Sequence, residues 1–182
     1  MNIIFDFDGV ICSSQEEMMR RLSARTGKNF TINDWTVYNP KYCFGEYTDE
    51  LKKIFCENLY VGPACKIYKE TVNAMLLAQD RGHNVKIVTV CANEQVYKNK
   101  LMLMQDKGIE GIEIVPIYEG DKRGYKCDML IEDCIETLET SSAKYKILVQ
   151  KPWNIGRAKD DMLVALDDSG VFSFVDTITA QI

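Results

Sequence analysis

The sequence predicts an α/β protein in which helices cover both faces of a parallel β-sheet, giving three layers, with a small helical cap inserted after the first strand. Two observations favour this class. Short apolar runs rich in β-branched residues alternate with amphipathic helical stretches, as in βαβ units. A long stretch after the first apolar run carries helical and aromatic-rich segments instead of strands.

The predicted strands are short apolar runs that lack the strict alternation of a half-exposed sheet. Each therefore suits a strand that is covered on both faces. Four runs have this character and DMLIED is a fifth candidate; in chain order the five are residues 2–5, 85–90, 112–117, 128–133 and 145–150. The later segment MLVALDDSGVFSFV is compatible with two short strands or with a helix and a strand.

Helical periodicity appears between these runs. Residues 64–81 and 93–107 repeat apolar side chains at intervals of three and four, and the stretches stop at Gly82 and Gly108. A shorter helix is predicted over residues 134–140. Strands and helices in this order form right-handed βαβ units, and ligands of such sheets gather at the carboxyl ends of the strands.

The inserted stretch is predicted to form a cap over these strand ends. Ser14 and Glu17 have the spacing of a capping box that opens a helix, and Gly27 closes that helix. Residues 34–47 are irregular and dense in aromatic side chains. The predicted division is a core domain, residues 1–13 and 77–182, and a helical cap, residues 14–76.

Composition excludes several classes of function. The chain has 182 residues, which at roughly 150 residues per domain means one domain with a modest insertion. With 22 Lys and Arg against 27 Asp and Glu, the net charge of −5 argues against a nucleic-acid backbone as main partner and leaves small anions. The single histidine, His83, excludes a multi-histidine metal site and is expected to be a solvated turn residue. Catalysis would therefore rest on carboxylates.

Cysteine usage and hydropathy predict a cytoplasmic protein without a membrane partner. The seven cysteines are odd in number and show no two-residue gap, so we expect free thiols in a reducing compartment. The start MNIIFDFDGV fits neither a secretory signal nor a transit peptide. No run approaches the roughly 18 apolar residues of a membrane span. The oligomeric state is left open between a monomer and a homodimer.

Two acidic residues follow the first predicted strand. Asp6 and Asp8 point the same way from an extended chain, and Gly9 lets the chain turn sharply. Adjacent carboxylates repel each other unless a cation or a shared proton relieves them, and Mg²⁺ prefers carboxylate oxygens. The alternative for such a pair taken alone is an acidic end to a strand.

Two further strand ends carry polar residues. Thr89 closes the second strand just before a helix opened by Asn93, which places a hydroxyl and free backbone N–H groups at a helix N-terminus, an anion site. Glu132 and Asp133 close the fourth strand. An ordinary capped helix and a solvated acidic loop are the respective alternatives.

Together the strand ends predict phosphoryl transfer through an aspartyl-phosphate. That reaction requires a carboxylate nucleophile, a second carboxylate for proton transfer, a hydroxyl and a lysine for the phosphate oxygens, and an acid that completes a Mg²⁺ site. Two lysines shortly before the fourth strand, Lys122 and Lys126, compete for the phosphate role.

The motifs resemble those of the haloacid dehalogenase-like superfamily of phosphatases, and more closely its 5'(3')-deoxyribonucleotidase family. The resemblance rests, in order, on DFDGVIC (6–12), IVTVCAN (87–93), DKRGYKCDMLIEDC (121–134) and ILVQKPWN (147–154). It implies a Rossmann-like core with an inserted cap, Mg²⁺ as cofactor, and a phosphoric monoester hydrolase acting on nucleoside monophosphates. Deoxyribonucleotides are the expected substrates; the base and the 3' or 5' position are left open.

The resemblance also implies roles for individual residues. Asp6 would be the nucleophile and Asp8 the general acid and base, while Asp6, the backbone carbonyl of Asp8 and Asp133 would hold the metal. The phosphate ligands would be Thr89, Val90 and, by its spacing to the final acidic pair, Lys122.

The chain departs from the family pattern at two places. Glu132 replaces the first of two aspartates, and Ser13 and Ser14 stand where the family often carries an aromatic residue that stacks on the base. Base recognition is therefore assigned to Trp35 and Tyr38, with packing inside the cap as the alternative.

Two other hypotheses stay open. One is a phosphatase of this superfamily acting on another small phosphate ester or on a nucleic-acid end, which the acidic net charge disfavours. The other is a non-catalytic phosphate-binding module, whose mark would be loss of the nucleophile; Asp6 is present.

Overall fold

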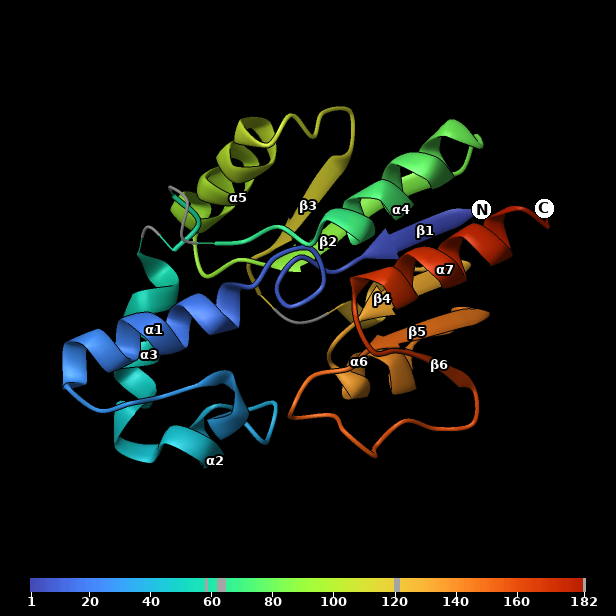
Figure 1. Ribbon diagram of the computed structural model, residues 1–182. Helices are drawn as coiled ribbons and strands as arrows, with labels where there is room; N and C mark the ends of the chain where they lie inside the picture. Colours follow the sequence, from blue (N-terminus) through green and yellow to red (C-terminus); the bar gives the residue numbers. More distant parts are fainter. Residues whose placement is uncertain (58, 62–64, 120–121, 182) are drawn as a thin grey trace.

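The computed structural model describes residues 1–57, 59–61, 65–119 and 122–181, and these form a six-stranded, all-parallel sheet with helices on both sides (Figure 1). The predicted α/β class is confirmed. All five predicted strands are present, and the ambiguous later segment contributes a sixth strand followed by a helix. The strands are β1 (Asn2–Phe5), β2 (Asn84–Val90), β3 (Glu113–Ile117), β4 (Met129–Glu132), β5 (Tyr145–Val149) and β6 (Met162–Ala165).

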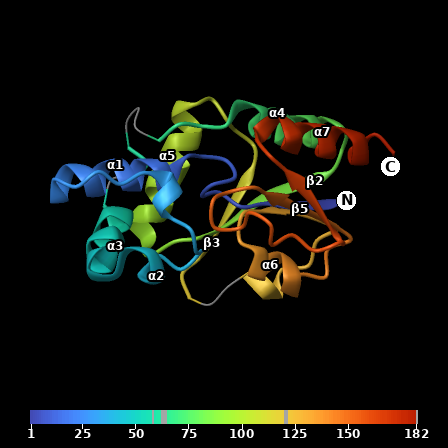
Figure 2. The same cartoon turned by 60° about the horizontal axis from the view of Figure 1, so that its bottom comes forward.

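Helices cover the two faces of the sheet unequally. One face packs against α4 (Lys69–Asp80), α5 (Glu94–Asp106) and α7 (Asp168–Thr179), and the other against α6 (Ile135–Thr140). Figure 2 shows α4 and α7 on one side of the sheet and α6 on the other. Because successive strand residues point to opposite faces, Ile3 and Phe5 join the larger core cluster while Ile4 joins the cluster around α6.

The strand order is β3-β2-β1-β4-β5-β6. The chain builds outward from β1 to β2 and β3, then returns to the other side of β1 to form β4. In sheets of this order the connections leave β1 and β4 in opposite directions, which opens a crevice at their carboxyl ends. The sheet therefore places the ends of β1 and β4 side by side at the position where such folds bind ligands.

A second helical group lies beyond these carboxyl ends (Figure 1). It comprises α1 (Ser14–Thr26), η1 (Ile32–Asp34), α2 (Lys41–Phe44), η2 (Gly45–Tyr47) and α3 (Thr48–Cys56). The predicted boundary between residues 76 and 77 falls inside α4, which packs against α7. The division into two domains stays a prediction.

Two predicted helix starts differ from the structure. The helix predicted over residues 64–81 begins at Lys69, because the preceding residues are extended and the Tyr68 N–H donates to the Ile11 carbonyl; Ala64 lies outside the described residues. The predicted capping box of Ser14 and Glu17 is also wrong. Ser13 is the N-cap without a side-chain cap bond, and the Glu17 carboxylate accepts hydrogen bonds from arginines further along α1.

The cysteines, the single histidine and the lengths of the helices can also be compared with the sequence-based expectations. All seven cysteines are free thiols. His83 is partly buried in the turn before β2, with Nδ1 3.2 Å from the Met1 amino group. Among the described residues, every helix is too short or too polar to cross a bilayer.

Candidate active site

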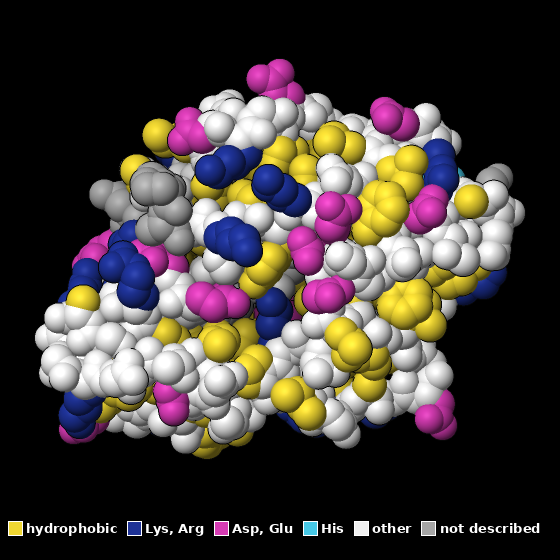
Figure 3. Space-filling view, in the orientation of Figure 1, with side chains coloured by type: hydrophobic (Ala, Val, Ile, Leu, Met, Phe, Trp, Pro, Cys, Tyr) yellow, Lys and Arg dark blue, Asp and Glu magenta, His cyan; other side chains and the backbone are white. Residues whose placement is uncertain are grey.

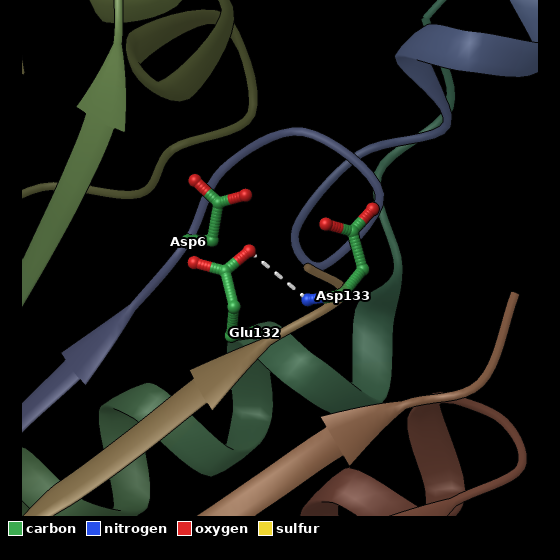
Figure 4. A group of neighbouring side chains, drawn as sticks. All are labelled: Asp6, Glu132 and Asp133. Atoms are coloured by element: carbon green, nitrogen blue, oxygen red, sulfur yellow. Dashed lines mark hydrogen bonds between the residues drawn. The ribbon is translucent and has the colours of Figure 1, made fainter. Parts of the chain in front are cut away.

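Three carboxylates meet where β1 and β4 end (Figure 4). Asp6 follows β1, Glu132 ends β4 and Asp133 comes next, and one oxygen from each lies within 4.8 Å of the others. All three side chains are buried. Residues more than 120 positions apart become neighbours because β1 and β4 pair directly.

Lys122 is the cation of this cluster. It comes from η3 (Lys122–Gly124), between β3 and β4. Its Nζ lies 2.5 Å from Asp6 Oδ1 and 2.7 Å from Glu132 Oε2. The second lysine candidate, Lys126, is exposed. The structure thus places Lys122, and not Lys126, against the buried carboxylates.

Glu132 is occupied by donors of the protein itself. Its Oε2 accepts from Lys122, and its Oε1 accepts from the backbone N–H groups of Asp133 and Cys134, each at 3.1 Å. A carboxylate held in this way fixes the lysine and the start of the following loop. Glu132 therefore holds the other groups of the cluster in position.

Asp133 has a different environment. The residue is 1% exposed, and the donor near its carboxylate among the described residues is Gln15 Nε2 at 3.5 Å. Its backbone carbonyl accepts from Trp153 and Asn154. Gly9 has φ +76°, and a Cβ there would lie 2.1 Å from Asp133 Oδ2. The carboxylate therefore lies directly against the turn after β1.

Negative charge exceeds positive charge in the cluster, since three buried carboxylates lie together with one lysine. Burial and the charge of Glu132 raise the pKa of Asp6 to about 7, and Lys122 opposes that rise. Burial, with Glu132 and Asp6, raises the pKa of Asp133 well above its ordinary value. Hard carboxylate oxygens with unbalanced charge suit a divalent cation.

Asp8 lies beside this cluster and has its own cation. Lys100 Nζ, from α5, lies 2.6 Å from Asp8 Oδ2, and the Tyr60 hydroxyl donates to Asp8 Oδ1 at 2.6 Å. Burial alone would raise the pKa of Asp8, but the charge and hydrogen bond of Lys100 lower it below its ordinary value.

The two residues predicted to bind phosphate at the end of β2 differ in their exposure and in their access to the cleft. Thr89 is buried, and its hydroxyl accepts a hydrogen bond from Lys100 at 2.8 Å. Val90 is 45% exposed, and its carbonyl accepts from the same lysine at 3.0 Å. Of the two, Val90 lines the adjacent cleft.

A cleft of about 1220 Å³ lies over the strand ends, and Asp6, Asp8 and Lys122 form part of its lining. Residues of α1 to α3 supply much of the remaining wall. Figure 3 shows hydrophobic side chains along the hollow between the helical group and the rest of the molecule, with charged side chains at its edges.

The predicted base-binding residues, Trp35 and Tyr38, both line this cleft. Trp35 is buried, with its ring centroid 5.6 Å from that of Trp153 and 5.5 Å from that of Phe44. Tyr38 is 42% exposed, and its ring lies 6.5 Å from Trp153. Trp35 therefore packs in a small aromatic core and also forms part of the cleft wall.

Sequence reasoning missed Lys100, Tyr60 and Trp153. A signal for the lysine existed, because Lys100 is four residues after Val96 and falls on the buried face of α5. Trp153 lay inside a quoted motif, but only the fold brings it to Trp35.

Comparison with known proteins finds solved structures that share this fold. No protein-family model and no curated protein sequence matches the chain. A haloacid dehalogenase-like family hydrolase from Xanthomonas campestris aligns over 100% of this chain and 96% of its own, with 14% identity and a TM-score of 0.57. D,D-heptose 1,7-bisphosphate phosphatase from Burkholderia thailandensis aligns over 97% of each chain, with 12% identity and a TM-score of 0.55.

A third solved structure, of D,D-heptose 1,7-bisphosphate phosphatase from B. bronchiseptica in complex with magnesium and phosphate, covers 100% of this chain and 99% of its own. Its identity is 12% and its TM-score 0.55. The finer resemblance to 5'(3')-deoxyribonucleotidases stays a prediction. The chain has the three-layer α/β fold of these three solved structures.

Proposed function

We propose that the protein is a Mg²⁺-dependent phosphomonoesterase that hydrolyses nucleoside monophosphates, deoxyribonucleotides above all, through an aspartyl-phosphate. The observation that carries this proposal is the placement of Asp6 in the lining of a large cleft, with Lys122 Nζ 2.5 Å from its carboxylate. A carboxylate paired with a cation at the carboxyl end of β1 is what nucleophilic attack on a phosphate ester needs. The fold, shared with phosphatases, supports the same reaction class.

In the proposed reaction an Asp6 oxygen attacks phosphorus and the ester P–O bond breaks. The leaving oxygen takes a proton from Asp8, and Lys122 stabilises the negative charge on the phosphoryl oxygens. Asp8 then removes a proton from a water molecule, whose oxygen attacks phosphorus. This step breaks the bond to Asp6 and releases inorganic phosphate.

The acidic cluster fits a divalent cation. Asp6, Asp133 and the backbone carbonyl of Asp8 would hold it, while Glu132, occupied by Lys122 and two backbone donors, would orient the cluster. When bound, Mg²⁺ supplies positive charge that offsets the carboxylates and the phosphate oxygens.

The aromatic wall of the cleft supports a nucleotide substrate. Trp35, Tyr38 and Trp153 offer ring faces and edges on which a nucleobase could stack. The cleft is also far larger than a phosphate group alone requires. A sugar phosphate or another small phosphate ester is the competing substrate class.

A cytoplasmic location and the choice between monomer and homodimer stay predictions.

A turnover screen tests the proposal. Purified protein with Mg²⁺ would be given nucleoside 5'- and 3'-monophosphates, sugar phosphates and 5'-phosphorylated DNA, and released phosphate would be measured. We expect the fastest release from deoxyribonucleoside monophosphates, its loss with EDTA and its recovery with added Mg²⁺. Release from sugar phosphates alone would overturn the substrate class, and no release from any ester would favour a non-catalytic module.

Asp8→Asn should lower turnover by about 10²–10⁴-fold, because an amide can neither protonate the leaving oxygen nor activate water. Binding of a non-hydrolysed substrate analogue and of Mg²⁺ should change little, since the proposed metal contact of Asp8 is its backbone carbonyl. Isothermal titration and steady-state rates measure the two quantities. A mutant with lost Mg²⁺ affinity and a wild-type rate at saturating metal would make Asp8 a side-chain ligand.

Gly9→Ala should lower turnover by about 10²-fold, because the new methyl group would displace the Asp133 carboxylate by a distance of the order of 1 Å. Gly82→Ala is the matched control: Gly82 also has positive φ, at +82°, but has nothing within 4 Å of its ideal Cβ. Both variants should lose about 1–2 kcal/mol of unfolding free energy through backbone strain. Equal activities of the two variants would contradict a role for the contact between Gly9 and Asp133.

A further inference from the structure

The two buried carboxylates at the end of β4 are satisfied to different extents by the protein. Glu132 accepts hydrogen bonds at both of its oxygens. For Asp133, the side chain that donates among the described residues is Gln15, whose Nε2 lies 3.5 Å from Oδ2, at the outer limit of a hydrogen bond. Within the described part of the chain, the Asp133 oxygens therefore have capacity left for a cation.

The main chain of Asp133, by contrast, is held on both sides. Its N–H donates to Glu132 Oε1 at 3.1 Å. Its carbonyl oxygen accepts from Asn154 Nδ2 at 2.8 Å and from Trp153 Nε1 at 3.1 Å. A carbonyl oxygen has two lone pairs, so these two donors use its capacity in full. Side chains 20 and 21 positions further along the chain thus fix the backbone of Asp133.

Asn154 is 1% exposed, and both polar atoms of its amide group are paired. Nδ2 also donates to the Val149 carbonyl at 2.9 Å, and Oδ1 accepts from the Lys151 N–H at 2.9 Å. Val149 is the last residue of β5, so one amide group joins the chain after β4 to the end of β5. Burial of an amide is costly unless the amide is hydrogen-bonded, and the bonds made here fix the ends of these two strands.

Trp153 joins the same carbonyl to the cleft wall. Its indole N–H is the second donor to the Asp133 carbonyl, and its ring centroid lies 5.6 Å from that of Trp35. Trp153 lines the cleft, whereas Asn154 does not. Asn154 therefore acts on the site through the residues that it holds.

The Asp133 carboxylate has little room to move independently of its main chain. The turn after β1 lies against it, since a Cβ on Gly9 would be 2.1 Å from Oδ2. One of its oxygens lies within 4.8 Å of oxygens from Asp6 and Glu132. Mg²⁺ requires near-ideal octahedral geometry with ligands at about 2.0–2.1 Å. A shift of the Asp133 main chain would consequently weaken cation binding.

We propose that Asn154 and Trp153 are positioning residues that set the Asp133 carboxylate for the divalent cation of the active site. The inference rests on the proposed function, since it concerns the cation of that reaction. Residues that orient a metal ligand without touching the metal typically contribute about 10–100-fold to metal affinity. Trp153 in addition presents its ring to the cleft, so Asn154 gives the cleaner test.

Cation affinity measured without turnover tests this role. Mn²⁺ binds to the same kind of oxygen ligands as Mg²⁺, and free Mn²⁺ is counted by its electron paramagnetic resonance signal. In protein freed of metal by EDTA and then dialysed, Asn154→Ala should raise the Kd for Mn²⁺ by about 10–100-fold. The Mg²⁺ concentration for half-maximal turnover should rise by a similar factor. At saturating Mg²⁺, kcat should return to within about fivefold of wild type, because excess cation fills the weakened site.

Two further variants separate positioning from loss of stability. Trp153→Phe keeps an aromatic ring in the cleft wall and removes the indole N–H, so it should raise the Kd for Mn²⁺ by a smaller factor. Val175→Ala is the matched control, because it shortens a fully buried side chain of α7 beside Asp176, which pairs with Arg81 near the amino end of β2. It should lower the thermal unfolding temperature and leave the Kd unchanged.

Different results overturn the proposal and the proposed function. An unchanged Kd in folded Asn154→Ala overturns the proposal, as does an equal rise of the Kd in Val175→Ala. If Asn154→Ala fails to fold by circular dichroism, Trp153→Phe decides: a raised Kd supports the proposal and an unchanged Kd overturns it. Wild-type protein that binds no Mn²⁺ overturns it as well. Wild-type protein that binds Mn²⁺ but hydrolyses no phosphate ester refutes the proposed function, a result on which the affinity measurements do not depend.

Discussion

Replacing Asp6 with asparagine should reduce phosphate release by on the order of 10⁴-fold or more while the fold survives. An amide keeps the volume of the side chain but is a far weaker nucleophile, so the covalent route through aspartyl-phosphate closes. Initial rates of phosphate release under saturating Mg²⁺ and nucleotide measure the loss. Trapping with radiolabelled substrate should detect a phosphoenzyme in the wild type and none in the variant.

The same substitution should leave stability equal or higher. Asp6 is buried beside Glu132, and its pKa of about 7 reflects the cost of holding a carboxylate there. Removing one of three crowded carboxylates relieves that repulsion, and Lys122 keeps its ion pair with Glu132, so no buried charge is left without a partner. Thermal unfolding followed by circular dichroism tests this, with Asp106→Asn on the exposed end of α5 as the matched control. Turnover within a few-fold of wild type would remove Asp6 from the nucleophile role.

Lys122→Met should reduce turnover by about 10³–10⁵-fold, whereas Lys126→Met should be nearly silent. A buried cation beside a transferring phosphoryl group stabilises the developing charge strongly, while an exposed surface lysine contributes almost nothing. Lys122 contacts both Asp6 and Glu132, and Lys126 is exposed. Steady-state kinetics of the two variants, with the folded fraction measured for each, give the comparison.

The stability of Lys122→Met must be followed because the change leaves two buried carboxylates without their cation. Removing one partner of a buried ion pair typically costs about 3–5 kcal/mol of unfolding free energy. Activity is therefore expressed per folded molecule, and bound Mg²⁺ is expected to recover part of the stability. An inactive Lys126→Met beside an active Lys122→Met would mean that the lysine of the reaction lies four residues further along the chain.

The sequence by itself determined the fold class and most elements. Alternation of β-branched runs with helical periodicity is a local property, so five strands and the stop of α1 at Gly27 could be predicted from short windows. The spacing of Asp6 and Asp8 and the acidic pair at the end of β4 were equally local. The sequence alone therefore identifies these residues as site candidates.

Only the tertiary structure decided which distant residues meet. The sheet order puts β1 beside β4, which brings Asp6 within reach of Asp133, and the path of η3 selects Lys122 over Lys126. Sequence patterns record periodicity along the chain, whereas these contacts depend on strand pairing across more than 100 residues.

Lys100 is the clearest example of a residue whose contacts cannot be predicted from the sequence. Its position on the buried face of α5 was readable from the sequence, but its partners were not, because Asp8 and Tyr60 lie 92 and 40 positions away along the chain. Burial of a charge is decided by whether the folded chain supplies acceptors. The acceptors of Lys100 come from the turn after β1 and from β2, and they meet it beside the Tyr60 ring only once the sheet has formed.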